Sequence, residues 1–463
     1  MRGVLTLRGP LCRCGRIPTV TLEQVFKAYD VRGVYPEEID EAIVERIGRA
    51  FVEVVGADEV FVGRDMRTSS PSLVAAFTRG VNDGGADVVD LGLVSTDLVY
   101  FAAGRLDRPG AMFTASHNPP EYNGIKLCRA GAAPVGIDTG LGEIRELAAR
   151  DLEPARSRGS VRELDLLADF ASHLLGLVDA DAIAPLVVAI DAANGMGGRV
   201  VPAVFGRLPL KTIELYFELD GTFPNHPADP IQPENLADLR RAVLDNGADI
   251  GLAFDGDADR VFCVDEHAEL VSGSLTTALV AGRLLDRHPG ETVIHNVICS
   301  RVVAETIREH GGEPVRSRVG HSYIKGLMAE TGAVFAGEHS GHYYFRDNFR
   351  ADSGLLAALF VLEAMSLERK PLSELLAPLQ RYVASGELNT RVDDQAAAID
   401  RVARRFADGE HDSLDGLTVS YADRWLNVRP SNTEPLLRLN VEAVDRATME
   451  RMRDDALEAI QGG

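Results

Sequence analysis

Short apolar runs bounded by turn residues alternate along most of the chain with longer segments whose apolar residues recur at helical spacing. Three of the apolar runs predict buried strands that lead into loops: 59–64, 186–191 and 291–298. The helical patterns at 38–55 and 236–246 end next to Gly56 and Gly247, and glycine is a favoured residue just after a helix. This alternation predicts three similar α/β units.

The pattern changes after Pro371. Four strand-like segments follow: 381–389, 418–420, 425–429 and 436–443. They accompany a helical stretch at 394–406 and a final helix at 448–460. The end of the chain therefore predicts a smaller α+β domain.

A chain of 463 residues is too long for one hydrophobic core, and its length favours three or four domains. No short repeat period is visible, so any internal repeat is structural. The predicted fold class is α/β, with three related mixed α/β domains and a C-terminal α+β domain. The predicted division is a tail at 1–20, α/β domains at 21–158, 159–267 and 268–371, and an α+β domain at 372–463.

The charge balance excludes some classes of partner. The 70 acidic and 48 basic side chains give a formal charge of −22, which would repel a nucleic-acid backbone and an anionic membrane surface. No apolar run reaches ~18 residues, so no membrane span is expected. Five scattered cysteines and no signal-peptide pattern favour a reducing cytoplasm. An anionic substrate would need a local cluster of arginines.

A polar loop at 113–120 carries a candidate nucleophile, Ser116. Two consecutive prolines prevent this segment from continuing as a helix, and we expect the serine to be exposed there. Taken alone, the segment is more typical of a turn in which Ser116 and Asn118 bond to nearby backbone groups.

A second loop, 255–260, places Asp255, Asp257 and Asp259 at alternate positions directly after the apolar strand 250–254. Three clustered carboxylates repel one another unless a cation joins them, and a loop can direct all three at one hard cation. The chain returns at once to an apolar strand at 261–264, so the acids are expected to be poorly solvated. Metal binding is a better account than a solvated turn.

A calcium-binding EF-hand is the alternative for this loop. Asp255, Asp257, Asp259 and Glu266 match its positions one, three, five and twelve, but Arg260 stands where the sharp turn requires glycine. Strands rather than helices are predicted on both sides. Magnesium, sharing an oxygen of a phosphoryl group, is therefore preferred.

Two further loops offer groups suited to a sugar phosphate. In GEHSGH, 337–342, a carboxylate and a hydroxyl can bond sugar hydroxyls, although a glycine-rich turn is an equally good account of this segment alone. In RPSNTEP, 429–435, a guanidinium stands beside hydroxyls, an amide and backbone N–H groups, a set of donors suited to phosphate oxygens. A capped turn between strands is the alternative. The segments 27–33 and 122–126 add cations, and 319–325 adds a histidine.

Taken in order, TASHNP (114–119), DGDADR (255–260), GEHSGH and RPSNTEP resemble the four signature loops of the α-D-phosphohexomutase superfamily. The resemblance spans roughly residues 25 to 445. KAYDVRG at 27–33, with SNT in the last loop, is similar to the bacterial phosphomannomutase/phosphoglucomutase branch. It implies three related α/β domains and a fourth, TATA-binding-protein-like domain, with one loop from each domain meeting in a central cleft.

The same resemblance implies residue roles. The implied catalytic residues are Ser116, which would be phosphorylated, with Lys126, Arg32, His117, Arg260 and His321. The implied substrate-binding residues are Glu338, Ser340, His342, Arg429, Ser431, Asn432 and Thr433. The implied ligands of Mg²⁺ are Ser116, Asp255, Asp257 and Asp259. One departure is the segment 296–299, where some dual-specificity relatives carry a lysine and this chain has none.

The implied activity is that of an isomerase-class phosphotransferase. It would interconvert mannose 6-phosphate and mannose 1-phosphate through a phosphoserine and a hexose 1,6-bisphosphate, which is both intermediate and activator. Its partners would be small hexose phosphates, and the chain would be a monomer or a dimer. Glucose and glucosamine phosphates remain alternative substrates. A sugar-phosphate-binding protein without catalysis would be expected to lack Ser116 or a metal carboxylate, and all four are present.

Overall fold

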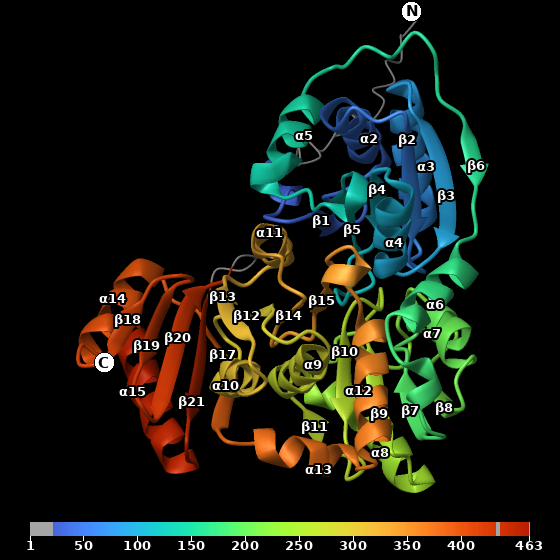
Figure 1. The fold of residues 1–463 in the computed structure, drawn as a ribbon. Helices are drawn as coiled ribbons and strands as arrows, with labels where there is room; N and C mark the ends of the chain where they lie inside the picture. The colour runs from blue at the N-terminus through green and yellow to red at the C-terminus, as the bar shows by residue number, and fades with distance from the viewer. Residues whose placement is uncertain (1–21, 432–435, 463) are drawn as a thin grey trace, which may run out of the picture.

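The structure is a computed structural model that describes residues 22–431 and 436–462. Four sheets follow one another along the chain, each with its own helices. The first three domains adjoin one another, and the C-terminal domain, red in Figure 1, stands to one side next to the third. The predicted tail at 1–20 lies outside the described residues. The predicted fold class is confirmed.

The first domain has a six-stranded mixed sheet in the order β1-β5-β4-β2-β3-β6. Its strands are β1 (Val31–Val34), β2 (Glu59–Arg64), β3 (Asp87–Leu93), β4 (Gly110–Phe113), β5 (Tyr122–Cys128) and β6 (Val161–Glu163). Its helices are α1 (Leu22–Val25), α2 (Glu41–Val55), α3 (Ser70–Asp83), α4 (Thr96–Leu106) and α5 (Leu141–Ala148). α2 begins where Asp40 accepts a bond from the N–H of Ile43, and it ends at left-handed Gly56, as predicted. The serine loop joins the antiparallel strands β4 and β5.

The second domain has a five-stranded sheet in the order β11-β10-β9-β7-β8. Its strands are β7 (Val187–Asp191), β8 (Lys211–Leu215), β9 (Ile250–Phe254), β10 (Val261–Val264) and β11 (Leu270–Val271). Its helices are α6 (Leu167–Gly176), α7 (Gly197–Phe205) and α8 (Ala237–Asn246). β9 and β10 are fully buried antiparallel neighbours, so the loop between them is held at both ends.

The third domain has a five-stranded sheet in the order β13-β12-β14-β15-β16. Its strands are β12 (Thr292–Asn296), β13 (Glu313–Ser317), β14 (Phe335–Gly337), β15 (Tyr343–Phe345) and β16 (Ala351–Asp352). Its helices are α9 (Gly273–Arg287), α10 (Arg301–Glu309), α11 (His321–Thr331), α12 (Gly354–Glu368) and α13 (Leu372–Leu376). Short 3₁₀ turns connect elements of these domains: Ala130–Ala132, Ile137–Thr139, Ala180–Ala182, Pro233–Leu236, Arg346–Asn348 and Ala377–Leu379.

The fourth domain has a five-stranded antiparallel sheet in the order β17-β21-β20-β19-β18. Its strands are β17 (Val383–Thr390), β18 (Glu410–Asp412), β19 (Leu417–Ser420), β20 (Arg424–Pro430) and β21 (Leu437–Ala443). Helices α14 (Gln395–Arg405) and α15 (Arg446–Gln461) cover one face of this sheet (Figure 1). Four of the strands and both helices lie within two residues of the predicted segments, whereas β18 was not predicted.

The first three domains share a hydrophobic core, whereas the fourth domain has a separate one. One continuous apolar cluster joins the first three domains, from Phe61 in β2 through Leu252 in β9 to Leu359 in α12. The fourth domain has a core of its own, formed by its sheet and its two helices. No helix within the described ranges is long and apolar enough to cross a membrane. Apolar α12, for example, has 15 residues and spans only about 22 Å.

Candidate active site

Ser116 lies beneath the metal loop of the second domain. Its backbone is in the left-handed region, with φ 51°, and its side-chain Oγ donates a 2.6 Å hydrogen bond to Asp255 Oδ2. Arg260 Nη2 donates to the same Oγ at 3.4 Å. The expectation that this serine is exposed is wrong, because the residue is only 4% exposed. The covering groups come from another domain.

The three aspartates of the metal loop converge as predicted. Asp255, Asp257 and Asp259 are each at most 1% exposed, and each offers a carboxylate oxygen within 4.8 Å of the others. Among the described residues, Asp257 Oδ1 and Asp259 Oδ1 have no hydrogen-bond partner although both atoms are buried. Buried carboxylate oxygens need a compensating partner. The loop therefore fits a hard cation, with Ser116 Oγ beside it.

Lys126 in β5 supplies positive charge to the same cluster. Its Nζ donates to Asp257 Oδ2 at 2.7 Å and to Asp259 Oδ2 at 2.5 Å. Burial opposes the charge on Lys126, but the two carboxylates raise its pKa well above the usual lysine range. Burial likewise acts to raise the pKa of Asp257, yet Lys126 and the hydroxyl of Thr96 keep that pKa below its usual range. Lys126 and Asp257 are thus held in their charged forms, whereas burial raises the pKa of Asp255 to about 7 and the pKa of Asp259 above its usual range.

The structure does not support the EF-hand alternative. Strands β9 and β10 flank the loop, as predicted, and Glu266 turns away to accept hydrogen bonds from the N–H and hydroxyl of Ser373. The group of three aspartates does not include Glu266.

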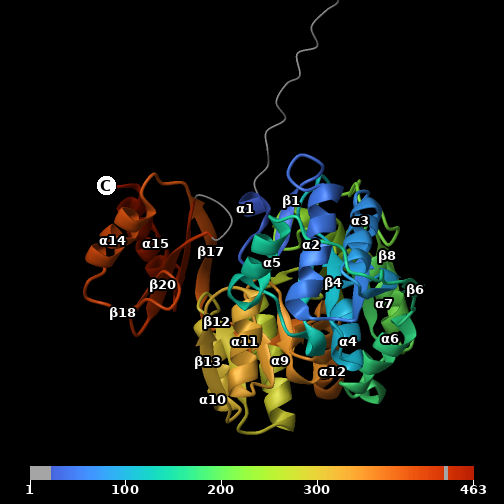
Figure 2. The same cartoon turned by 90° about the horizontal axis from the view of Figure 1, so that it is seen from above.

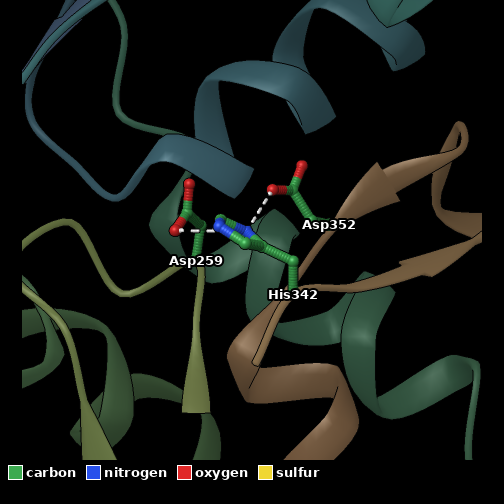
Figure 3. Close-up of side chains that lie close together, drawn as sticks. All are labelled: Asp259, His342 and Asp352. Atoms are coloured by element: carbon green, nitrogen blue, oxygen red, sulfur yellow. Dashed lines mark hydrogen bonds and ion pairs between the residues drawn. The ribbon is translucent and has the colours of Figure 1, made fainter. Parts of the chain in front are cut away.

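His342 lies between two carboxylates beside the metal loop (Figure 3). Its Nδ1 is 3.0 Å from Asp352 Oδ2 and 3.8 Å from Asp259 Oδ1. Burial alone would lower the pKa of His342, but these two neighbours raise it above the usual histidine range. Lys325 Nζ lies 2.8 Å from Asp352 Oδ1, so a buried cation already compensates that carboxylate. We interpret this group as one that holds His342 beside the metal loop.

The glycine-rich loop between β14 and β15 presents Glu338 and Ser340. Glu338 is buried and accepts hydrogen bonds from Tyr344 OH (2.7 Å) and Asn296 Nδ2 (3.2 Å). Ser340 Oγ lies 3.5 Å from Glu338 Oε2. The two predicted sugar-binding groups are therefore neighbours, and the carboxylate is held from two sides. Asn296 belongs to the segment 296–299, which contains no lysine.

The other cations and histidines lie around Ser116 at varying distances. Arg32 Nη1 donates to Asn118 Oδ1 at 2.6 Å, so it reaches the serine loop through a side chain. His117 Nδ1 lies 3.3 Å from Ser116 Oγ, and burial, with the nearby charge of Arg260, lowers its pKa well below the usual range. The ring of His321, at the start of α11, lies 5.1 Å from the ring of Tyr29, measured between centroids. Burial and Lys325 lower the pKa of His321 to about 3.

Arg429 lies in β20 of the fourth domain. It is buried, and its Nη2 donates to Glu387 Oε2 at 3.3 Å. Burial raises the pKa of Tyr29 to about 12, an increase to which Glu338 adds and which Arg429 opposes. Residues of the first, third and fourth domains therefore lie within electrostatic reach of one another. Ser431 is described, whereas Asn432 and Thr433 lie outside the described residues.

Two side chains that the sequence did not single out belong to this site. Arg67 follows β2 and donates to the backbone of the serine loop. Thr96, the first residue of α4, donates its hydroxyl to Asp257 Oδ2 at 2.5 Å. The only signal for Arg67 was a polar, basic segment directly after a predicted strand.

Comparison with models of known protein families identifies the family to which all four domains are similar. Four family models described as "Phosphoglucomutase/phosphomannomutase" match this chain in order. The model of alpha/beta/alpha domain I matches residues 23–153, domain II matches 168–269, domain III matches 272–382 and the C-terminal domain matches 387–459.

Curated relatives and a solved structure agree with this match. A phosphomannomutase of Salmonella typhimurium is 42% identical over 430 residues, covering 90% of this chain and 94% of that protein. A protein of Xanthomonas campestris described as phosphohexose mutases is 39% identical, covering 94% of this chain and 99% of its own length. A phosphoglucomutase/phosphomannomutase family protein of Burkholderia thailandensis has a crystal structure with a TM-score of 0.87 at 36% identity, covering 95% of this chain and 98% of that one.

Proposed function

The chain belongs to the phosphoglucomutase/phosphomannomutase family, and from this premise we propose that it interconverts hexose 1-phosphates and hexose 6-phosphates, with mannose phosphates as its preferred substrates. The observation that carries the proposal is the Oγ of Ser116, 2.6 Å from Asp255 at the edge of a three-carboxylate cluster. Similarity to curated phosphomannomutases supports the choice of sugar.

Ser116 is the phosphoryl carrier in this proposal. In the first half-reaction the bond between phosphorus and Ser116 Oγ breaks while a bond to the free hydroxyl of the sugar monophosphate forms. The resulting hexose 1,6-bisphosphate turns over in the cleft. In the second half-reaction its other phosphoryl group passes to Ser116 Oγ and leaves the product hydroxyl. His117, whose ring nitrogen lies 3.3 Å from Oγ, is the neighbour suited to exchange the proton.

Asp255, Asp257 and Asp259 would hold Mg²⁺, with Ser116 Oγ as a further ligand. The metal would supply neutralisation of charge on the transferring phosphoryl group. The protein's own cations add to this: Arg260 stands over Oγ and Lys126 joins the carboxylates. Phosphoryl transfer depends chiefly on such positioning and charge compensation.

The remaining loops would bind the sugar and its second phosphate. Glu338 and Ser340 present a carboxylate and a hydroxyl to sugar hydroxyls, and Arg429 presents a guanidinium to the phosphate that is not reacting. We further propose that the enzyme works in the cytoplasm. The described cysteines, Cys128, Cys263 and Cys299, are free and buried, which fits a reducing compartment.

The test combines turnover with location of the phosphate. Purified protein with Mg²⁺ and hexose 1,6-bisphosphate should convert mannose 1-phosphate to mannose 6-phosphate faster than it converts the glucose or glucosamine analogues. Peptide mass spectrometry should find one phosphate, on Ser116. A phosphate on another residue, or conversion that proceeds without phosphorylation, would contradict the mechanism. Faster turnover of glucose 1-phosphate would overturn only the choice of sugar.

A further inference from the structure

A fully buried guanidinium lies under the serine loop. Arg67, in the connection between β2 and α3, is 1% exposed. Its donors are distributed as follows: Nε to Asp65 Oδ2 (3.2 Å), Nη1 to the carbonyls of Pro119 (2.7 Å) and Tyr122 (3.0 Å), and Nη2 to the carbonyls of Ser116 (2.9 Å) and Asn118 (2.6 Å). A guanidinium has five N–H donors in a fixed plane. Every one of them is used, and four end on one loop.

These bonds explain how the serine loop can turn its carbonyls inward. Four backbone carbonyls that face one buried point repel one another, and each would lose its solvent partners without compensation. A single planar cation satisfies all four at once and fixes the angles between them. Lysine, a point charge with three donors, cannot reproduce this pattern.

The loop also needs to be held because Ser116 has an unfavourable backbone conformation. A residue other than glycine with φ near 51° costs free energy and persists only where its surroundings impose it. Its N–H donates to Thr114 Oγ1 at 2.9 Å and its carbonyl accepts from Arg67. The backbone of the metal loop also packs directly against the serine loop. A side chain at Gly256 would not fit there, because its Cβ would lie 2.4 Å from the carbonyl oxygen of Ser116.

Arg67 is itself immobilised. The carboxylate of Asp65 accepts hydrogen bonds from both the backbone N–H of Arg67, at 3.0 Å, and its side-chain Nε. The hydroxyl of Ser70 donates to the same carboxylate at 2.8 Å. The ring of Phe223, from the second domain, lies 5.1 Å from the guanidinium carbon. The arginine is therefore fixed from both domains that form the phosphorylation site.

We propose that Arg67 is a positioning residue that sets where Ser116 Oγ stands relative to the metal loop, acting through the backbone of residues 116–122 and without touching the sugar phosphate. The proposal rests on the function proposed above. It implies that the serine is presented at a fixed point, so the bisphosphate has to turn toward the serine. A misplacement of about 1 Å can cost roughly a hundredfold in rate, so a small loosening of this loop should be measurable.

The test is Arg67→Lys, with Arg49→Lys as its matched control. Arg49 in α2 also clamps the first domain, donating to the Leu152 carbonyl at 2.5 Å and to Asp83 at 2.9 Å, but neither of these hydrogen bonds reaches the serine loop. For both variants we would measure Tm, kcat and KM for mannose 1-phosphate, and the single-turnover rate of phosphate transfer from hexose 1,6-bisphosphate to Ser116.

We expect Arg67→Lys to lower kcat and the single-turnover rate by about ten- to a hundredfold, with KM within about threefold of the wild type. Arg49→Lys should lower Tm but keep kcat within about twofold, because its clamp does not reach the serine. Wild-type kcat in folded Arg67→Lys would overturn the proposal. So would equal losses of kcat in both variants, which would indicate general destabilisation.

If Arg67→Lys does not fold, Ser70→Ala provides a milder test. It removes the hydrogen bond that the Ser70 hydroxyl donates to Asp65 and the one that it accepts from Asn123 Nδ2 at 3.0 Å. It should lower kcat a few-fold at unchanged KM, and an unaltered kcat would then contradict the proposal. Phosphorylation of the wild-type enzyme distinguishes failure of the proposed function from failure of the positioning role. If the wild type carries no phosphate on Ser116, the proposed function itself fails. If it does and Arg67→Lys transfers phosphate normally, only the positioning role fails.

Discussion

The contacts that join the first three domains differ in kind from the contacts that join the third domain to the fourth. Between the first three domains a single apolar core is continuous, and the serine loop and metal loop meet at its edge through Ser116, Asp255 and Lys126. Between the third and fourth domains the contacts that we identify are largely polar. The guanidinium of Arg301 donates to the carbonyls of Tyr421 and Arg424, for example. Figure 2 shows the fourth domain to one side, beside β12 and β13.

This difference separates two tasks. Opening a packed core exposes apolar area at about 25 cal/mol per Å², whereas water can replace the partners of a hydrogen bond at small net cost. The groups proposed to transfer the phosphoryl group thus lie on the part that is hard to deform. Arg429, proposed to bind the other phosphate, lies on a domain with its own core. In this proposal such a domain would adjust its position while the bisphosphate turns.

The largest expected effect tests the rigid junction. Ser116→Ala should lower turnover by roughly a thousandfold or more, because it removes the phosphoryl carrier. Stability should fall by only about 1 kcal/mol, since Asp255 loses one hydrogen bond but keeps the one from Arg260 Nε at 2.9 Å. Steady-state kinetics and thermal unfolding measure the two quantities.

The control for that experiment is Ser172→Ala, on an exposed face of α6, where the hydroxyl donates to the Ala168 carbonyl and accepts a hydrogen bond from Arg207 Nη1 at 2.8 Å. It should change neither quantity appreciably. Substantial turnover in Ser116→Ala would move the carrier to another residue.

The next effect concerns the metal loop at the same junction. Asp257→Asn should weaken Mg²⁺ binding and lower kcat by roughly a hundredfold, with a smaller change in KM, because the carboxylate would hold the metal that neutralises charge on the transferring phosphoryl group. Titrating Mg²⁺ while following turnover measures both. Asp249→Asn is a matched control just before β9, where the carboxylate accepts only the Val187 N–H among the bonds described. An unchanged kcat at limiting Mg²⁺ would place the metal elsewhere.

A smaller effect is expected across the polar junction. Arg429→Ala should raise KM for mannose 1-phosphate and mannose 6-phosphate alike, since the bisphosphate presents each phosphate to this domain in turn. Charge-assisted hydrogen bonds contribute about 1.5–3 kcal/mol, which is roughly ten- to a hundredfold in binding. Arg405→Ala, which breaks an exposed pair with Asp455 in the same domain, should leave KM unchanged. Normal KM for both sugars in Arg429→Ala would show that this loop is only a turn.

The sequence predicted features that depend on local contacts, and it failed for features that depend on contacts between domains. Strand 59–64 and the end of α2 at Gly56 depend on neighbours within a few residues, and both are confirmed. The burial of the three aspartates, expected from the apolar strands on both sides of their loop, is also confirmed. The burial of Ser116 depends on Asp255 and Arg260, about 140 residues away, which no local pattern encodes.

Two further features escaped for related reasons. Arg67 bonds backbone carbonyls, and a carbonyl leaves no mark on the sequence that distinguishes this arginine from a solvated one. Strand β18, with the sequence EHD, has no apolar alternation because none of its three residues is fully buried. Tertiary contacts alone decide both.

The smallest effect concerns Glu442, a carboxylate buried at the polar junction. It is 3% exposed, and it accepts hydrogen bonds from Trp425 Nε1 (2.8 Å) and from the N–H of Arg301 in the third domain (3.1 Å). Burial raises its pKa above the usual range. An acid whose pKa is raised on folding contributes stability below its unfolded value, about 4.3, and loses that contribution as pH rises through the folded value. The wild-type junction should therefore weaken as pH rises above about 4.3.

Glu442→Gln should remove this pH dependence, because the amide keeps an acceptor for the two donors without a charge to bury. At pH 7 we expect the fourth domain of the variant to be as stable as that of the wild type, or more stable by about 1 kcal/mol. Trp425 is the chain's single tryptophan, so its fluorescence during urea unfolding at pH 5 and pH 8 reports on this junction alone. Exposed Glu410→Gln on β18 is the control. If the wild type gained stability relative to Glu442→Gln between pH 5 and pH 8, the buried charge would be stabilising, and the polar junction would be a firmer attachment than the comparison with the apolar core implies.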